Sequence, residues 1–175
     1  MLIPKNRRLF IAFQISPELT AQIQIWRGEQ KIQFPLRWAP PENYHVTLIP
    51  PFYDVSADEA IKKVRAAVAG CQTFSVSFDR VRVGPGARQP RLIWAEGNTP
   101  QPLLNLKAAL DLQFIPKETR AFRLHLTLAR FKRDERNVAF ESSVNWTDHV
   151  GNVSLLESVL SKEGAVHHVI EKISF

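Results

Sequence analysis

Two short motifs in this chain combine the residue types best suited to acid–base chemistry. His45-Val46-Thr47-Leu48 and His125-Leu126-Thr127-Leu128 share one pattern, a histidine and a threonine two positions apart with a leucine after them. Residues i and i+2 of a β-strand point to the same face, so each histidine is expected beside its threonine. The apolar residues of the motifs are then expected to face the core.

The two motifs suggest chemistry at phosphorus. An imidazole titrates near neutral pH, so a neutral ring can accept a proton while a protonated ring donates one. Two such rings suit in-line displacement at a phosphodiester, where the attacking and leaving oxygens lie on opposite sides of phosphorus. Hydroxyl groups beside them can bind the non-bridging oxygens. We therefore predict that His45 and His125 are catalytic and that Thr47 and Thr127 bind phosphate.

A motif of this kind has a plainer interpretation, a structural histidine beside a threonine that merely suits a strand. A single copy would favour that interpretation, because short motifs often match by chance. Two copies in corresponding places of an internal repeat favour the catalytic interpretation instead.

Basic and aromatic residues surround both motifs. Arg130, which follows Thr127 closely, is predicted to bind phosphate, although an ordinary surface arginine would have the same sequence signature. Further basic residues predict a rim for a nucleic-acid strand, with a solvated charged surface as the alternative: Arg37, Arg120, Arg123, Lys132 and Arg133. Three aromatic residues are candidates for stacking on a base, with an ordinary core position as the alternative for each: Trp38, Tyr44 and Phe52.

Each motif is placed by a strand–helix–strand unit, and the two units resemble each other in order and in letters. RLFIAF and YHVTLI enclose a helix in the first unit, as RLIWAE and LHLTLA do in the second. The repeat predicts two lobes around a pseudo-twofold axis. Alternation and turn signals predict strands at 8–14, 36–39, 44–49, 74–83 (with a bulge at 79–80), 91–97 and 122–130, and a hairpin of 152–160 with 166–175. Helices are predicted to begin at Ser16-Pro17, at Ser56 and at Thr99-Pro100.

Length and composition limit the remaining possibilities. The 175 residues are expected to form a single domain, 1–175, and the net charge of +6 favours an anionic partner. Cys71 is the only cysteine, which excludes an internal disulfide and a cysteine-based metal site. No apolar run is long enough to cross a bilayer. We expect a monomer in the cytoplasm, with no membrane association and no obligate protein partner.

The remaining histidines carry a weaker signal. His167 and His168 are adjacent, so on a strand they point to opposite faces and cannot be neighbouring ligands. His149 stands apart from both motifs. A zinc site needs three or four converging ligands, and the motifs supply one histidine per strand. Neither a metal ion nor another cofactor is expected.

The paired motifs resemble those of the 2H phosphoesterases. The flanking sequences RWAPPENYHVTL (37–48) and HLTLAR (125–130) are similar to those of the bacterial and archaeal RNA 2′,3′-cyclic phosphodiesterases, also called 2′-5′ RNA ligases. The opening RLFIAFQISPEL (8–19) and the C-terminal LLESVLSKEG (155–164) fit the same family. The resemblance therefore extends over nearly the whole chain.

This resemblance implies an α+β fold of two pseudo-symmetric lobes, each an antiparallel sheet with helices outside, around an active cleft. It implies metal-independent hydrolysis of RNA 2′,3′-cyclic phosphate ends to 2′-phosphomonoesters, with 2′-5′ joining of RNA as a related activity. His45 would protonate the departing 3′ oxygen and His125 would activate water, with Thr47, Thr127 and Arg130 on the phosphate. The near identity of the motifs leaves the exchanged roles open.

The chain departs from the family pattern at three places, which leaves the choice of substrate open. Ile49-Pro50-Pro51-Phe52 stands where a Phe-Leu-Gly turn is common, Leu124 replaces a proline, and His167-His168 stands near a common tyrosine position. The alternative functions are a non-catalytic RNA-binding module, or a 2H phosphodiesterase acting on ADP-ribose cyclic phosphate or 2′-5′ oligonucleotides.

Overall fold

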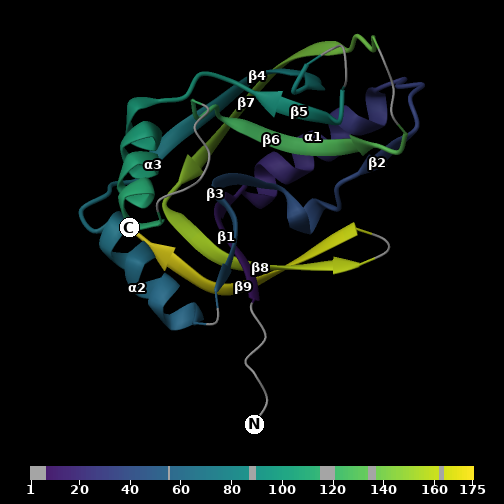
Figure 1. Ribbon diagram of the computed structural model, residues 1–175. Coiled ribbons are helices and arrows are strands. Elements are labelled where there is room, and N and C mark those ends of the chain that lie inside the picture. The colour runs from purple at the N-terminus through teal and green to yellow at the C-terminus, as the bar shows by residue number, and fades with distance from the viewer. Residues whose placement is uncertain (1–6, 55, 87–89, 115–120, 134–136, 162–163) are drawn as a thin grey trace.

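The strands of the chain form two antiparallel sheets, with helices around them (Figure 1). The computed structural model describes residues 7–54, 56–86, 90–114, 121–133, 137–161 and 164–175. In chain order its elements are β1 (Arg7–Gln14), α1 (Pro17–Glu29), β2 (Leu36–Trp38), the 3₁₀ helix η1 (Pro41–Asn43), β3 (His45–Asp54), α2 (Ala57–Val68), β4 (Phe74–Gly84), β5 (Leu92–Glu96), α3 (Gln101–Phe114), β6 (His125–Phe131), β7 (Glu141–Val150), β8 (Asn152–Ser161) and β9 (Gly164–Ser174).

The order of the strands confirms the predicted repeat. The four-stranded sheet has the order β3-β1-β8-β9, and the five-stranded sheet has the order β2-β6-β5-β4-β7. In each, the two strands of a strand–helix–strand unit pair antiparallel, β1 with β3 and β5 with β6. The short strand β2, from the first unit, pairs with β6 of the second. The α+β class and the two similar lobes are therefore confirmed.

The helices join the two lobes because each unit's connecting helix contacts the other unit's sheet. Helix α1 contacts β7 of the five-stranded sheet, and α3 contacts β3 of the four-stranded sheet. At the start of α1, Ser16 caps the helix by accepting a hydrogen bond from the amide of Leu19, and its own amide donates to Asp148 at 2.8 Å. Trp26 of α1 donates from its indole to Ser142 of β7. None of the described helices is long and apolar enough to cross a membrane.

Two features of the edge strands were not predicted. Strand β7 has no counterpart among the expected strands, because half of its side chains are polar and exposed and only Trp146, Asp148 and Val150 are buried. Strand β3 continues to Asp54, through Pro50 and Pro51, where the sequence predicted an end at residue 49. Because β3 is at the edge of its sheet, a missing backbone N–H can face away from the partner strand.

Candidate active site between the two sheets

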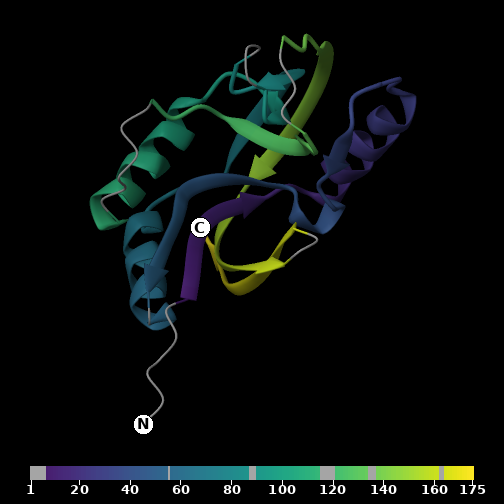
Figure 2. The same cartoon turned by 45° about the vertical axis from the view of Figure 1, so that its right-hand side comes forward.

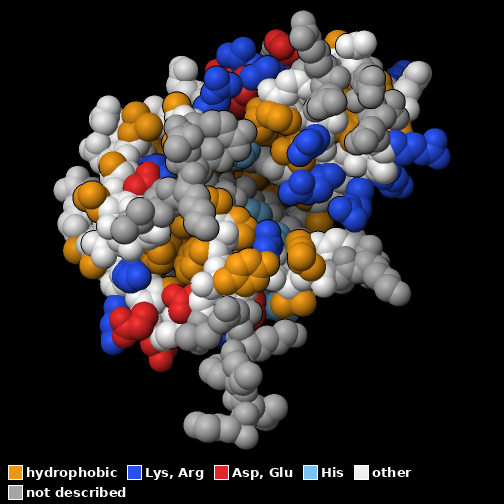
Figure 3. Space-filling model, viewed as in Figure 1, with side chains coloured by type: hydrophobic (Ala, Val, Ile, Leu, Met, Phe, Trp, Pro, Cys, Tyr) orange, Lys and Arg blue, Asp and Glu red, His pale blue; other side chains and the backbone are white. Residues whose placement is uncertain are grey.

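The two histidine–threonine motifs meet where β3 and β6 contact each other between the sheets. Both views of the ribbon show these strands side by side in the middle of the molecule (Figures 1 and 2). The apolar positions of the motifs are buried at 0% or 1% exposure, as expected: Val46, Leu48, Leu126 and Leu128. The histidines and threonines on the opposite face are partly exposed. Figure 3 shows histidine side chains within a hollow between the upper and lower halves, with basic side chains on its rim.

Both histidine rings are oriented by the same backbone contact. Nδ1 of His45 lies 2.6 Å from the carbonyl oxygen of Asn43, and Nδ1 of His125 lies 2.9 Å from that of Arg123. A carbonyl can only accept, so Nδ1 carries the proton in both rings. The described residues offer no hydrogen-bond partner to either Nε2. Each neutral ring therefore presents an unprotonated Nε2, and each protonated ring presents an Nε2–H donor.

Matching bulges follow the two threonines. Ala12 pairs with Thr47 and Ile11 with Ile49, so Leu48 is an extra residue in β3. Trp94 pairs with Thr127 and Ile93 with Ala129, which makes Leu128 the extra residue in β6.

The bulge in β6 explains how Arg130 reaches the site. Strict alternation would place Arg130 on the face opposite Thr127, whereas one extra residue returns it to the same face. Burial lowers the pKa of His45 and of His167, and the positive charge of Arg130 lowers both further. In β3 the corresponding position is occupied by Pro50.

His45 lies in a cluster of three rings. Its ring centroid is 5.2 Å from that of Phe10 and 5.2 Å from that of His167, and the latter two are 4.9 Å apart. Burial lowers the pKa of His45, a lowering that the nearby His125 and Arg130 increase and the Asn43 carbonyl opposes. His45 and His125 stand at the starts of β3 and β6, the two strands that contact each other between the sheets.

His125 has a different neighbour, the indole of Trp94, whose ring centroid lies 4.8 Å away. The indole packs in turn on Gly84, where a Cβ atom would come within 2.5 Å of its ring. Glycine at position 84 therefore leaves the space that the Trp94 indole occupies beside His125, whose ring is tilted by 52° to the indole. Position 12 of β1, which corresponds to Trp94 by register, is an alanine, so β1 places no aromatic ring opposite Thr47.

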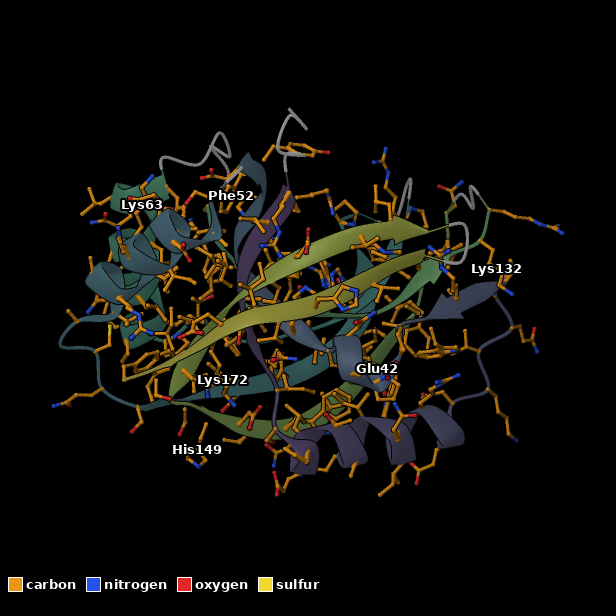
Figure 4. All side chains as sticks on the ribbon, turned by 90° about the horizontal axis from the view of Figure 1, so that it is seen from below. Glu42, Phe52, Lys63, Lys132, His149 and Lys172 are labelled. Atoms are coloured by element: carbon orange, nitrogen blue, oxygen red, sulfur yellow. The ribbon has the colours of Figure 1, made fainter. Side chains whose placement is uncertain are left out.

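Part of the predicted basic rim is also assembled. Arg37 of β2 pairs in register with Arg130 of β6, and each lies at the surface of the site. Burial, and then the charge of Arg37, lower the pKa of Arg130, which remains a cation at neutral pH. Arg123, Lys132 and Arg133 are exposed, and Arg120 lies outside the described residues. Figure 4 shows Lys132 at the far end of β6.

The three aromatic residues predicted to stack on a base are engaged elsewhere. Tyr44 is 1% exposed, and its hydroxyl accepts a hydrogen bond from Gln24, so this prediction was wrong. Trp38 packs against Trp26 and lies under the guanidinium of Arg27.

Phe52 packs against Phe114 of α3, 5.4 Å between ring centroids, on the side where α2 and α3 lie (Figure 4). Its position at the far end of β3 from His45 removes it from the site.

The sequence argument missed Phe10, Trp94 and His167, which line the site. His167 was set aside because its neighbour His168 points the other way, and the structure confirms that opposition, with His168 exposed. The alternation of side chains along β9 could have shown that His167 and His168 lie on opposite faces of the hairpin, so that one of them can face the site. His149 lies on β7 beside Ser75 and points outward, away from the site (Figure 4). No group of three or more metal-ligating side chains converges among the described residues.

Comparisons with known proteins identify relatives of this chain. A model of the 2′-5′ RNA ligase superfamily matches residues 15–157. The chain is 24% identical over 181 residues to an RNA 2′,3′-cyclic phosphodiesterase of Aquifex aeolicus, covering 94% of this chain and 95% of that protein. It is 31% identical over 103 residues to an RNA 2′,3′-cyclic phosphodiesterase of Bacillus subtilis, covering 54% and 55%.

Solved structures share the fold at low identity. A protein of Thermus thermophilus matches with a TM-score of 0.80 at 22% identity, covering 95% of this chain and 97% of that one. LigT of Escherichia coli, solved with 3′-AMP, matches with a TM-score of 0.79 at 21% identity, covering 98% and 99%.

Proposed function

Because the chain belongs to the 2′-5′ RNA ligase superfamily, we propose that it hydrolyses RNA 2′,3′-cyclic phosphate ends to 2′-phosphomonoesters. The observation that carries the proposal is the pairing of His45 and His125, both with Nδ1 bonded to a carbonyl and Nε2 without a partner among the described residues. That arrangement supplies one proton acceptor and one proton donor to a single phosphate, without a metal ion.

The reaction balances with two proton transfers. Nε2 of His125 takes a proton from water as the water oxygen bonds to phosphorus. The bond from phosphorus to the 3′ oxygen breaks, and Nε2 of His45 gives its proton to that oxygen. The product keeps the phosphate on the 2′ oxygen, and exchange with solvent returns both rings to their starting states. An RNA 5′-hydroxyl in place of water would give a 2′-5′ linkage by the same steps.

Three further side chains hold the phosphate in this proposal. Thr47 and Thr127 stand beside the two histidines, and the described residues give neither hydroxyl a hydrogen-bond partner. Arg130 makes no ion pair with a described carboxylate. Its guanidinium therefore stays available to stabilise negative charge as it builds up on the non-bridging oxygens.

The assignment of His45 as the acid depends on the charge of the substrate. In the free protein burial and neighbouring cations lower the pKa of His45, so its neutral form predominates at pH 7. A phosphodiester anion beside the ring raises that pKa again by favouring the cation. The exchanged assignment, with His45 as the base, does not require the substrate to raise this pKa.

One experiment tests the activity itself. RNA with a 2′,3′-cyclic phosphate end is incubated with the protein in excess EDTA, and the product is analysed by mass spectrometry. We expect the gain of one water and a 2′-phosphate. Binding without turnover would indicate a non-catalytic RNA-binding module, and activity only on ADP-ribose cyclic phosphate or 2′-5′ oligonucleotides would change the substrate.

A second experiment separates the two histidine roles. In a cyclic phosphate whose 3′ bridging oxygen is replaced by sulfur, the leaving thiolate needs no protonation. The variant that lacks the acid recovers activity on this substrate, and the variant that lacks the base does not. We expect recovery in His45→Ala and none in His125→Ala, and the reverse result would exchange the roles.

A further inference from the structure

Two neighbouring arginines at the start of β1 differ in how their charge is balanced. Arg7 forms a two-point ion pair with Glu157, with Nη2–Oε2 at 2.7 Å and Nε–Oε1 at 3.1 Å. Arg8 points to the other face of the sheet and donates from Nη1 to the hydroxyl of Ser158 at 2.6 Å. Within the described residues, Arg8 makes no ion pair with a carboxylate.

The face that Arg8 shares is the face of the active site. Leu9 pairs with Glu157 and belongs to the large core, whereas Phe10 pairs with Leu156 on the opposite face, where its ring meets His45. Alternation along β1 therefore places Arg8 on the side of Phe10. Figure 3 shows basic side chains both above and below the histidines of the hollow.

His167 connects Arg8 to the catalytic pair. It stands directly opposite Ser158 in the β8–β9 hairpin, and its ring lies edge-on to His45 at 5.2 Å. The hairpin is also held beside η1, where Asn43 donates to the carbonyl of Ala165 of β9 at 3.2 Å. Arg8, Ser158 and His167 thus form a continuous polar row that ends beside His45.

His167 takes part in this row as a neutral group. Burial, together with the charges of His45, Arg8, Arg130 and His168, lowers its pKa to about 4. Its Nδ1 is buried without a partner, and the described residues provide none for Nε2. Because an orphaned buried N–H is costly, the proton is better placed on Nε2, where a ligand can accept it.

We propose that Arg8, Ser158 and His167 form a second anion subsite, which binds the 5′-phosphate of the nucleotide that carries the cyclic phosphate. The proposal rests on the proposed function. In an RNA end this phosphate is the next anion along the strand, one ribose away from the reacting phosphorus. A guanidinium has five N–H donors, and Arg8 uses one on Ser158, which leaves others for phosphate oxygens.

The subsite makes the protein an enzyme for RNA ends and 5′-phosphorylated nucleotides in preference to nucleoside cyclic phosphates. The test compares kcat/KM for adenosine 2′,3′-cyclic phosphate with that for the same compound carrying a 5′-phosphate. We expect the wild-type protein to prefer the 5′-phosphorylated compound by about tenfold or more, the size of one charge-assisted contact. This preference should shrink as salt is added.

Arg7 supplies a matched control, because Arg7→Gln and Arg8→Gln make the same chemical change on opposite faces of one strand. We expect R8Q to remove most of the preference, R8K to retain part of it, and R7Q to keep it. Thermal unfolding of each variant checks the fold. Equal treatment of both compounds by the wild-type protein, or an equal preference in R8Q and R7Q, would overturn the subsite. Failure of the wild-type protein to hydrolyse either compound would instead overturn the proposed function.

Discussion

His45 and His125 are presented by their strands in the same way but lie among different neighbours. In both, a carbonyl two residues earlier fixes Nδ1, and a bulge follows the threonine. Beyond that frame, His45 is enclosed by Phe10 and His167, whereas His125 rests on Trp94. The repeat gives both rings the same backbone contact at Nδ1, whereas the surroundings differ, and burial lowers the pKa of His45.

The second position beyond the extra residue of each bulge also differs between the two motifs. In the second motif it holds Arg130, which brings a fixed positive charge, and in the first it holds Pro50, which brings none. The backbone is thus alike in the two motifs, whereas the neighbouring side chains differ. This combination suits an in-line reaction, because the attacking oxygen must lose a proton and the leaving oxygen must gain one in matched positions.

The largest effect is expected from removing either ring. His45→Ala and His125→Ala should each lower kcat/KM on a nucleoside 2′,3′-cyclic phosphate by about 10²–10⁴-fold. The double variant should lose little more than the worse single one, since the rings act as a unit. His149→Ala is the control, because that ring points away from the site. Full activity in either single variant would show that the two rings do not act as a catalytic pair.

A smaller loss is expected for Arg130→Gln, about 10²-fold in kcat/KM, because a cation facing the transition-state charge is lost. The same change removes a charge that lowers the pKa of His45, so that pKa should rise. An NMR titration of the His45 ring checks the direction. Lys62→Gln, on an exposed lysine of α2, should change neither quantity. A pKa of His45 that stays or falls in R130Q would contradict the placement of Arg130.

Changes at Trp94, which packs on His125, should lower kcat/KM less and should affect His125 but not His45. Trp94→Ala removes the surface on which His125 rests, and we expect kcat/KM to fall about tenfold as the ring loses its orientation. Trp94→Phe keeps an aromatic surface and should recover most of that activity. The His45 titration should be nearly unchanged in both variants. Equal losses of kcat/KM in Trp94→Ala and Trp94→Phe would argue against orientation of His125 by packing on an aromatic ring.

The smallest expected effect is on the pH dependence of stability. Between its ordinary pKa of 6.5 and the lowered value of about 4, His167 takes up a proton in the unfolded state but not in the native state. Stability therefore falls as pH decreases through this range. His167→Phe retains the ring contacts and removes this titration, so its stability should fall less. Urea unfolding at pH 7 and pH 4.5 measures the difference, and an equally steep fall in both proteins would contradict it.

The sequence predicted what depends on local pattern. The strand–helix–strand repeat, the shared face of each histidine and threonine, and the burial of Val46 and Leu126 follow from alternation, and the structure confirms them. The sequence could not show that a bulge returns Arg130 to the site, because a bulge is defined by the partner strand. It also missed His167, because its contact with His45 joins the β8–β9 hairpin to a strand more than a hundred residues earlier in the chain.

The central claim is that both imidazoles act on one phosphorus from opposite sides. A crystal structure of the protein with adenosine and orthovanadate, which mimics the five-coordinate transition state, tests it directly. We expect Nε2 of His45 and Nε2 of His125 to contact the two apical oxygens of a single vanadium, with Thr47, Thr127 and Arg130 on the equatorial ones. A vanadate held by only one of the histidines, or by both from the same side, would contradict the account.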